Sequence, residues 1–229
     1  MSTIEKNIAK VGARIREAAQ AVDRDPANVG LLAVSKTQPS GAIREAFTAG
    51  ARDFGENYLQ EALDKQADLT DLPLVWHFIG PIQSNKTKPI AEHFDWVHSV
   101  DRLKIAQRLS DQRPAELPPL NICLQVNVSG EASKSGCAPE ELNDLAQAVA
   151  AMPRLHLRGL MCIPAPSDDA AEQRAAFARL RTLRDELPLK LDTLSMGMSQ
   201  DLEAAIAEGA TWVRIGTALF GARDYGRPQ

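Results

Sequence analysis

Short apolar runs alternate with amphipathic helical stretches along the chain, and this alternation restricts the fold more than any other feature. We predict eight strands, at residues 31–36, 51–57, 74–80, 95–100, 120–129, 156–164, 191–197 and 211–216. Four stretches with helical periodicity lie between strands, at residues 40–50, 99–112, 138–152 and 169–187. Because many of the predicted strands are almost continuously apolar, the pattern favours a parallel sheet covered by helices.

Eight strand–helix units in 229 residues fit a closed (β/α)8 TIM barrel of near-minimal size. An open doubly wound sheet is the alternative, but no G-x-G-x-x-G sequence follows a predicted strand. We therefore predict an α/β fold, with a single TIM-barrel domain over residues 1–229 and an extra N-terminal helix. Thr3 is the expected N-cap of that helix. The apolar positions of the helix recur at the right spacing, at Ile4, Ile8, Val11, Ile15 and Ala19.

Charge and cysteine content narrow the class of protein. The net charge is −4 and basic residues are mixed with acidic ones, which argues against nucleic acid as a partner. The first 22 residues carry charges every few positions, so they predict neither a signal peptide nor a membrane span. The three cysteines form no C-x-x-C pair and no metal-type spacing with histidine. We therefore expect a cytoplasmic protein with reduced thiols and no metal site.

Lys36 is the first candidate for a functional role. The stretch GLLAVSKTQP places it at the end of an apolar strand, where a lone lysine most often only marks the point at which the strand meets water. In a TIM barrel, however, the carboxyl ends of the strands form the active site. Asn57 occupies the corresponding place after the second strand. His77 lies within the third strand, and we predict a hydrogen-bonded core residue there, outside the site.

The segments after the last two strands predict a phosphate site. SMGMS places Gly197 and Ser199 after the seventh strand, with a helix expected to begin near Ser199, and RIGTALFG places Gly216 and Thr217 after the eighth. Hydroxyls, backbone N–H groups and helix N-termini at these two positions of a barrel are suited to a phosphate. A Schiff-base lysine opposite a phosphate site indicates pyridoxal phosphate, although a phosphosugar aldolase has the same two requirements.

Several stretches, in order along essentially the whole chain, resemble those of the pyridoxal phosphate homeostasis proteins. The most specific is WHFIGPIQSNKTKPI at residues 76–90, accompanied by AVSKTQP, FGENY, LRGLMCIP, LSMGMS and RIGTALFGAR. The resemblance implies a barrel similar to the N-terminal domain of alanine racemase, with pyridoxal phosphate bound as an aldimine. It also implies a role in holding, buffering or delivering this cofactor to apo-enzymes that require it.

The resemblance assigns roles residue by residue. Carried over by position, Lys36 is the aldimine lysine, Asn57 lies near the phenolic oxygen of the ring, and Arg214 lies near the pyridine nitrogen. The other cofactor-binding residues hold the phosphate or line the pocket, namely Ser199, Gly216, Thr217 and Met198. At Gln38 this chain departs from many relatives, which have a second lysine, so a peripheral electrostatic contribution is in doubt there.

Arg214 also bears on whether the chain catalyses a reaction. A guanidinium has donors and no acceptor, so it can bond only to an unprotonated pyridine nitrogen, which makes the ring a weaker electron sink. Racemisation on such a barrel uses the lysine and a tyrosine from a second domain. Here Gln229 soon follows the eighth strand, and Tyr58 and Tyr225 are the only tyrosines.

Three functions therefore remain open, in order of preference. A non-catalytic carrier of pyridoxal phosphate comes first, a minimal racemase dependent on the same cofactor second, and a Schiff-base aldolase without cofactor third. The carrier is expected to be a monomer. Lys134, in the small polar loop after the fifth strand, is a possible secondary residue that captures the cofactor as it enters or leaves.

Overall fold

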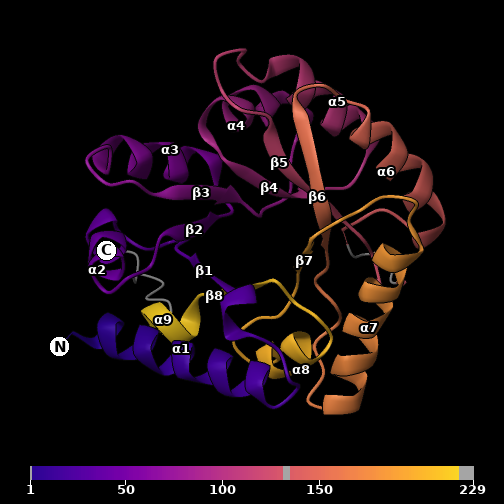
Figure 1. Cartoon of the computed structure of the whole chain (residues 1–229). Coiled ribbons are helices and arrows are strands. Elements are labelled where there is room, and N and C mark those ends of the chain that lie inside the picture. The colour runs from indigo at the N-terminus through magenta and orange to yellow at the C-terminus, as the bar shows by residue number, and fades with distance from the viewer. Residues whose placement is uncertain (1, 131–134, 222–229) are drawn as a thin grey trace, which may run out of the picture.

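The computed structural model describes residues 2–130 and 135–221, and in them the eight predicted strands form a closed barrel (Figure 1). Neighbouring strands are parallel and follow one another in chain order, with β8 paired to β1. The (β/α)8 prediction is confirmed. The strands are β1 (Gly30–Val34), β2 (Asp53–Glu56), β3 (Val75–Phe78), β4 (Trp96–Val100), β5 (Leu120–Gln125), β6 (Leu155–Met161), β7 (Thr193–Ser195) and β8 (Trp212–Ile215).

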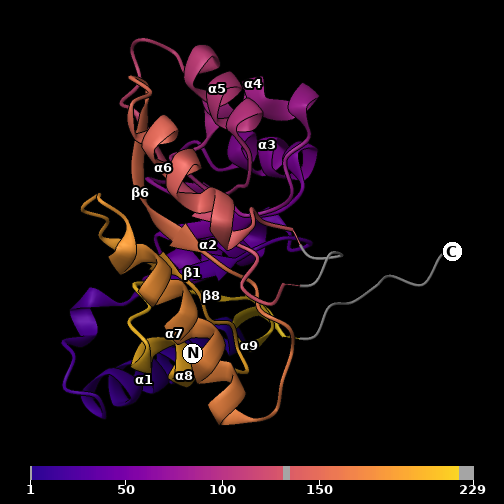
Figure 2. The same cartoon turned by 90° about the vertical axis from the view of Figure 1, so that its right-hand side faces the viewer.

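Helices surround the barrel, and Figures 1 and 2 place α1, α8 and α9 together on the side opposite α4 and α5. None of the helices in the described residues combines the length and apolar character that a membrane crossing requires. The α-helices are α1 (Thr3–Gln20), α2 (Ser40–Thr48), α3 (Leu59–Asp68), α4 (Thr87–His93), α5 (Leu103–Gln112), α6 (Leu142–Ala150), α7 (Ala170–Glu186), α8 (Leu202–Ala207) and α9 (Thr217–Phe220). Short 3₁₀ turns occur at η1 (Pro26–Asn28), η2 (Ser84–Lys86) and η3 (Pro139–Glu141).

The predicted N-terminal helix is present as α1, but its N-cap is Ser2 and the prediction of Thr3 is wrong. Ser2 Oγ accepts the Glu5 N–H at 3.1 Å, and the Glu5 carboxylate accepts the Ser2 N–H at 3.2 Å. This capping box needs an acidic residue three positions after the cap, whereas Lys6 stands three positions after Thr3. The predicted apolar face of α1 packs against α8 and α9.

Buried apolar side chains form one large cluster that joins the strands to the surrounding helices, and a separate small cluster of Trp96, Cys123 and Met161. The interior is not entirely apolar. His77, His98, Ser195 and Arg214, from four different strands, are at most 4% exposed. Buried polar groups of this kind need hydrogen-bond partners, so their contacts matter for what the barrel does.

Candidate functional site

A pocket of about 570 Å³ opens at the carboxyl end of the barrel. Its walls come from the residues that follow β1, β2, β3, β6, β7 and β8, as the barrel architecture predicts. All the residues that the sequence assigned to a cofactor line this one pocket: Lys36, Asn57, Met198, Ser199, Arg214, Gly216 and Thr217. Gln38 lines it as well. The predicted cofactor residues, which come from segments far apart in the sequence, thus supply an amine, an amide, a guanidinium and two hydroxyls to one cavity.

Lys36 is half-buried and lies two residues beyond the last residue of β1. A tight turn follows it, because the Gln38 N–H donates to Ser35 O at 3.0 Å. Thr37 adopts a left-handed backbone conformation with φ of 65°, which is uncommon for a β-branched residue. Such strain persists only where the surroundings enforce it.

A buried ionic network supplies those surroundings. Lys65 of α3 donates to Ser35 O at 2.7 Å and to Glu56 Oε1 at 2.9 Å, and Ser35 Oγ donates to Glu56 Oε1 at 2.6 Å. Lys65 also pairs with Glu61, which accepts the Thr37 N–H at 2.6 Å. The peptide groups on both sides of Lys36 are therefore anchored to the same cluster. Burial raises the pKa of Glu56, although Lys65 and Ser35 act in the opposite direction.

Asn57 follows the last residue of β2, lines the pocket and carries an unpaired acceptor. Its Oδ1 atom is buried and has no hydrogen-bond partner among the described residues. A buried polar atom without a partner is unusual, and a ligand in the pocket is one way to satisfy it. Gly80 packs against the Asn57 backbone so closely that a Cβ there would lie 2.4 Å from Asn57 O. The close packing of Gly80 thus restricts movement of the Asn57 backbone.

Arg214, on β8, is 4% exposed and points from the barrel wall into the pocket lining. Its Nη1 donates to Ser195 Oγ at 2.9 Å, and its Nη2 donates to Cys162 O at 2.9 Å. Burial lowers the pKa of Arg214 from its ordinary value. Arginine nevertheless remains a cation and a pure donor in proteins. The group can therefore only offer hydrogen bonds to a ligand.

The segment after β7 differs from the prediction in one respect. We expected a helix near Ser199, but α8 begins at Leu202, and residues 199–201 form a turn. The turn arises because Asp201 Oδ1 accepts the Met198 N–H at 2.6 Å. Gly197 has φ of 97° and no room for a side chain, since a Cβ would lie 2.5 Å from Ala205 Cβ. This tight turn presents Met198 and Ser199 to the pocket.

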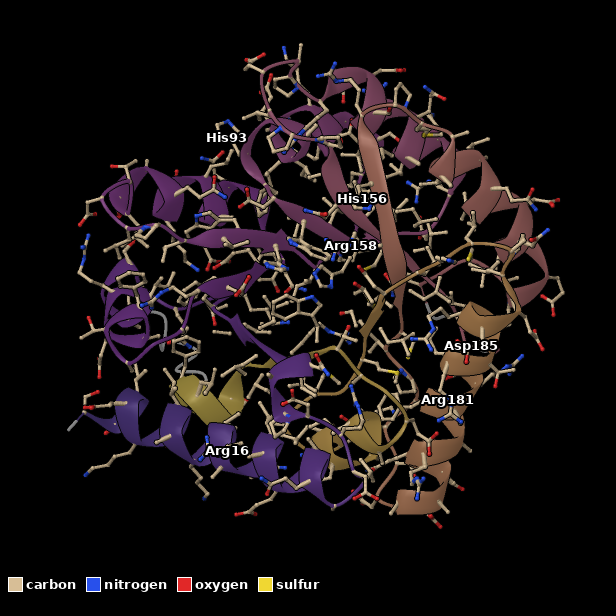
Figure 3. All side chains as sticks on the ribbon, viewed as in Figure 1. Arg16, His93, His156, Arg158, Arg181 and Asp185 are labelled. Atoms are coloured by element: carbon tan, nitrogen blue, oxygen red, sulfur yellow. The ribbon has the colours of Figure 1, made fainter. Side chains whose placement is uncertain are left out.

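The N-terminal helix reaches the same segment. Arg14 of α1 donates to Ser199 O at 3.1 Å and makes two hydrogen bonds to the Glu203 carboxylate, at 2.8 and 2.9 Å. Figure 3 labels Arg16, two residues further along α1, whose side chain is exposed. Arg14, unlike Arg16, therefore braces one wall of the pocket from outside the barrel.

Gly216 and Thr217 lie where β8 ends and the one-turn helix α9 begins. The first N–H groups of a helix have no acceptor within the helix, so they are available to a ligand. A Cβ at Gly216 would lie 3.4 Å from both Val34 Cβ and Val34 O, which is already contact distance. Position 216 thus lies against Val34, in the wall that β1 and β8 share.

The structure also shows lining residues that sequence reasoning missed. The segment after β6, to which the sequence analysis assigned no role in the site, contributes one wall, and the turn after Ser199 contributes another. The missed lining residues include Ile163, Pro164, Pro166, Ser167, Gln173, Gln200 and Asp201. Pro164 and Pro166 in the IPAPSDD stretch could have signalled an ordered loop at a strand end. No group of His, Cys, Asp or Glu in residues 2–130 and 135–221 is arranged to hold a metal.

Two residues from the sequence analysis lie elsewhere. His77 is fully buried, bonds to Asp53 and His98, and does not line the pocket, which confirms its prediction as a core residue. Lys134 lies outside the described residues, so its role as a secondary residue stays a prediction. The three cysteines are free and buried, and burial raises the pKa of each thiol to about 12.

Comparison with known proteins places the chain in a family. The profile of the alanine racemase N-terminal domain matches residues 7–224. A pyridoxal phosphate homeostasis protein of Pseudomonas aeruginosa is 79% identical over 228 residues, covering 100% of this chain and 99% of the relative. One of Escherichia coli is 55% identical, covering 99% and 100%.

A solved structure of a similar protein supports the same family assignment. PipY of Synechococcus elongatus, determined with pyridoxal phosphate bound, superimposes with a TM-score of 0.84 at 44% sequence identity. The match covers 95% of this chain and 100% of PipY. The fold, the pocket and the matches over the whole length lead to one conclusion: the chain belongs to the pyridoxal phosphate homeostasis protein family, built on the barrel of the alanine racemase N-terminal domain.

Proposed function

We propose that this chain binds pyridoxal phosphate in the carboxyl-end pocket, as a Schiff base with Lys36, and holds the cofactor for homeostasis rather than for catalysis. The observation that carries the proposal is the convergence of Lys36, Asn57, Arg214 and the two hydroxyl-bearing segments in one cavity. The names of the relatives and the ligand in PipY support the same ligand here.

The donor set fits the chemistry of this cofactor. Pyridoxal phosphate supplies an aldehyde that condenses with an amine, and Lys36 is the amine in the pocket lining. Arg214 offers only hydrogen-bond donors, which suits an unprotonated pyridine nitrogen. Ser199, Thr217 and the first N–H groups of α9, which have no acceptor within the helix, suit a phosphate. Asn57, which lines the same pocket, supplies a side-chain amide whose N–H groups can donate to the ring oxygen.

The same lining supports a holding role. Within the described residues the pocket contains one amine, Lys36, and one carboxylate, Asp201, and no tyrosine, histidine or cysteine side chain. Asp201 Oδ1 already accepts the Met198 N–H at 2.6 Å. Racemisation through two bases needs a second proton carrier across the ligand from the lysine. We therefore propose that the domain acts as a cytoplasmic monomer that buffers the cofactor and delivers it to apo-enzymes.

The covalent site is tested by spectroscopy and peptide mapping. Purified protein incubated with pyridoxal phosphate should show a visible absorption band, and borohydride followed by digestion should label Lys36. Lys36→Ala should lose the band. The control Lys190→Ala, which changes an exposed lysine just before β7, should keep it. A label found mainly on another lysine would overturn the assignment, and the absence of any band would favour the aldolase alternative.

The holding role is tested separately. The loaded protein should transfer pyridoxal phosphate to an apo-enzyme, measured as recovered activity of the recipient. It should not exchange the α-proton of L-alanine for deuterium, measured by proton NMR over several hours. Exchange that is abolished in both Lys36→Ala and Asp201→Asn would instead identify the racemase alternative, with Asp201 as its second base.

A further inference from the structure

A continuous chain of polar side chains crosses the barrel interior from the pocket. Arg214 Nη1 lies 2.9 Å from Ser195 Oγ, and Ser195 Oγ lies 2.7 Å from His98 Nδ1. His98 Nε2 lies 2.8 Å from His77 Nδ1, and His77 Nε2 lies 3.0 Å from Asp53 Oδ1. These five residues, Arg214, Ser195, His98, His77 and Asp53, are called the polar chain below.

The polar chain connects the two ends of the barrel. Arg214 lines the pocket at the carboxyl end, whereas Asp53 is the first residue of β2 and so lies toward the amino end. The Asp53 side chain is 24% exposed, while the other four members are at most 4% exposed. Asp53 therefore exposes one end of the polar chain to solvent at the amino end of the barrel, and Arg214 exposes the other end to the ligand pocket.

The direction of every hydrogen bond in the polar chain follows from its two ends. The Asp53 carboxylate only accepts, so His77 Nε2 carries a hydrogen, and a neutral His77 must accept at Nδ1. His98 then donates from Nε2 and accepts at Nδ1, which makes the Ser195 hydroxyl the donor to His98. Because Ser195 Oγ gives its hydrogen to His98, its lone pairs are available to accept the hydrogen bond from Arg214. Each member thus donates toward Asp53, with a cation at one end and an anion at the other.

The surroundings keep both histidines neutral. Burial, then the neighbouring His77 and Arg214, hold the pKa of His98 well below its ordinary value. Burial also lowers the pKa of His77, while Asp53 and Asp95 act in the opposite direction. Trp96 stacks on the His77 ring at 5.5 Å between centroids and Trp212 meets its edge at 5.2 Å, so aromatic rings separate it from water.

Arg158 packs on Trp96, one of the two aromatic rings that separate His77 from water. Figure 3 labels Arg158 near the middle of the barrel, and its guanidinium lies 4.7 Å from the centre of the Trp96 ring. Asp192 accepts hydrogen bonds from Arg158 at 2.9 to 3.2 Å, and its side chain is 63% exposed. Asp192 is thus a second carboxylate at the amino end that is not a member of the polar chain.

Such a chain is not needed to fill a barrel. Interior layers of TIM barrels are dominated by branched apolar side chains, and replacing buried polar clusters with apolar residues is often neutral for stability. We propose that Ser195, His98, His77 and Asp53 are positioning residues that hold Arg214 in one orientation toward the ligand. The contacts of Arg214 with the ligand then depend on a carboxylate at the opposite end of the barrel. This inference rests on the proposed function only for the identity of the ligand.

The hydrogen-bond directions are tested on the protein without cofactor. Long-range proton–nitrogen NMR of histidine-labelled protein distinguishes neutral Nε2–H, neutral Nδ1–H and charged imidazole. We expect both His77 and His98 as neutral Nε2–H from about pH 6 to 8. His93 and His156, which are exposed and labelled in Figure 3, serve as solvent-accessible references. A charged ring, or an Nδ1–H form of either buried histidine, would overturn the assigned directions.

The coupling to the pocket is tested on the loaded protein with matched variants. Ser195→Ala and Asp53→Ala should each weaken pyridoxal phosphate binding about 5- to 10-fold and shift the visible band. Ser195→Thr, which keeps the hydroxyl, should restore the band, and Asp192→Ala should behave as wild type. If Asp53→Ala matches Asp192→Ala in affinity and spectrum, the long-range coupling is overturned. If wild type binds no pyridoxal phosphate, the proposed function fails, while the NMR result still decides the hydrogen-bond directions.

Discussion

Replacing Lys65 with methionine tests whether the buried ionic network holds the turn that carries Lys36. Lys65 Nζ lies 2.9 Å from Glu56 Oε1, and the two side chains are 6% and 0% exposed. The same ammonium bonds to Ser35 O, directly before Lys36. Methionine has a similar length and no charge, so the substitution removes the ionic contacts with little change in packing.

The expected loss is large because Glu56 is left without its counter-ion. Removing one partner of a buried ion pair typically costs about 3–5 kcal/mol of unfolding free energy. Lys88→Met is the matched control, since Lys88, like Lys65, pairs with a glutamate four positions away on its own helix, but its side chain is 68% exposed. That control should change stability by no more than about 0.5 kcal/mol.

The loss should also depend on pH. Burial already raises the pKa of Glu56, and removing Lys65 takes away an effect that lowers it. The folded variant then binds the Glu56 proton more tightly than the unfolded chain does. Its stability therefore falls as pH rises from the unfolded pKa through the folded one. The difference between wild type and Lys65→Met should be greatest near pH 8 and smaller near pH 5.

Urea unfolding at several pH values measures these free energies, together with the double variant Glu56→Gln/Lys65→Met. The double variant should recover at least about 1 kcal/mol relative to the sum of the single variants. Pyridoxal phosphate affinity measured in parallel should fall in Lys65→Met, because the turn at Lys36 loses its anchor. Additive single effects, or a loss that does not vary with pH, would refute the reasoning.

Three further changes probe the pocket walls. Ser199→Ala combined with Thr217→Ala should weaken pyridoxal phosphate binding by about 2–5 kcal/mol in equilibrium dialysis, and an unchanged affinity would place the phosphate elsewhere. Arg14→Ala should weaken binding by about 0.5–1.5 kcal/mol because it releases Ser199 O, whereas Arg16→Ala should not, and equal effects would contradict the bracing role. Gly197→Ala should lower the urea-unfolding free energy by about 2–5 kcal/mol through its backbone conformation and the clash with α8, and a neutral result would contradict both.

The strands and the pocket residues at strand ends could be predicted because local pattern determines them. Apolar runs bounded by Gly, Pro and polar residues mark strands, and in a barrel each strand end is a potential site position. Lys36 and Asn57 were therefore singled out by their places at strand ends, whereas Arg214 and Met198 came from the family resemblance. The prediction of a helix that begins near Ser199 was wrong. The hydrogen bond from Met198 N–H to Asp201 forms a turn there, and α8 begins only at Leu202.

The supporting contacts could not be predicted in the same way. Lys65 and Glu56 belong to one ion pair, yet in the sequence Lys65 is an ordinary residue of an amphipathic helix. The polar chain joins residues from five strands, and no local pattern relates Asp53 to His77 or Ser195. Such contacts depend on strand register, which only the closed barrel fixes.

The pairing of β1 with β8 makes the pocket a product of late folding. Lys36 follows β1, near the start of the chain, whereas Gly216 and Thr217 follow β8, near its end. A growing chain on the ribosome cannot pair these strands until β8 has emerged, so Lys36 and the segment at Gly216 and Thr217 meet only at ring closure. A ligand that contacts both of these segments then stabilises the pairing of β1 with β8. At 100 times its dissociation constant it would add about 2.7 kcal/mol against reopening.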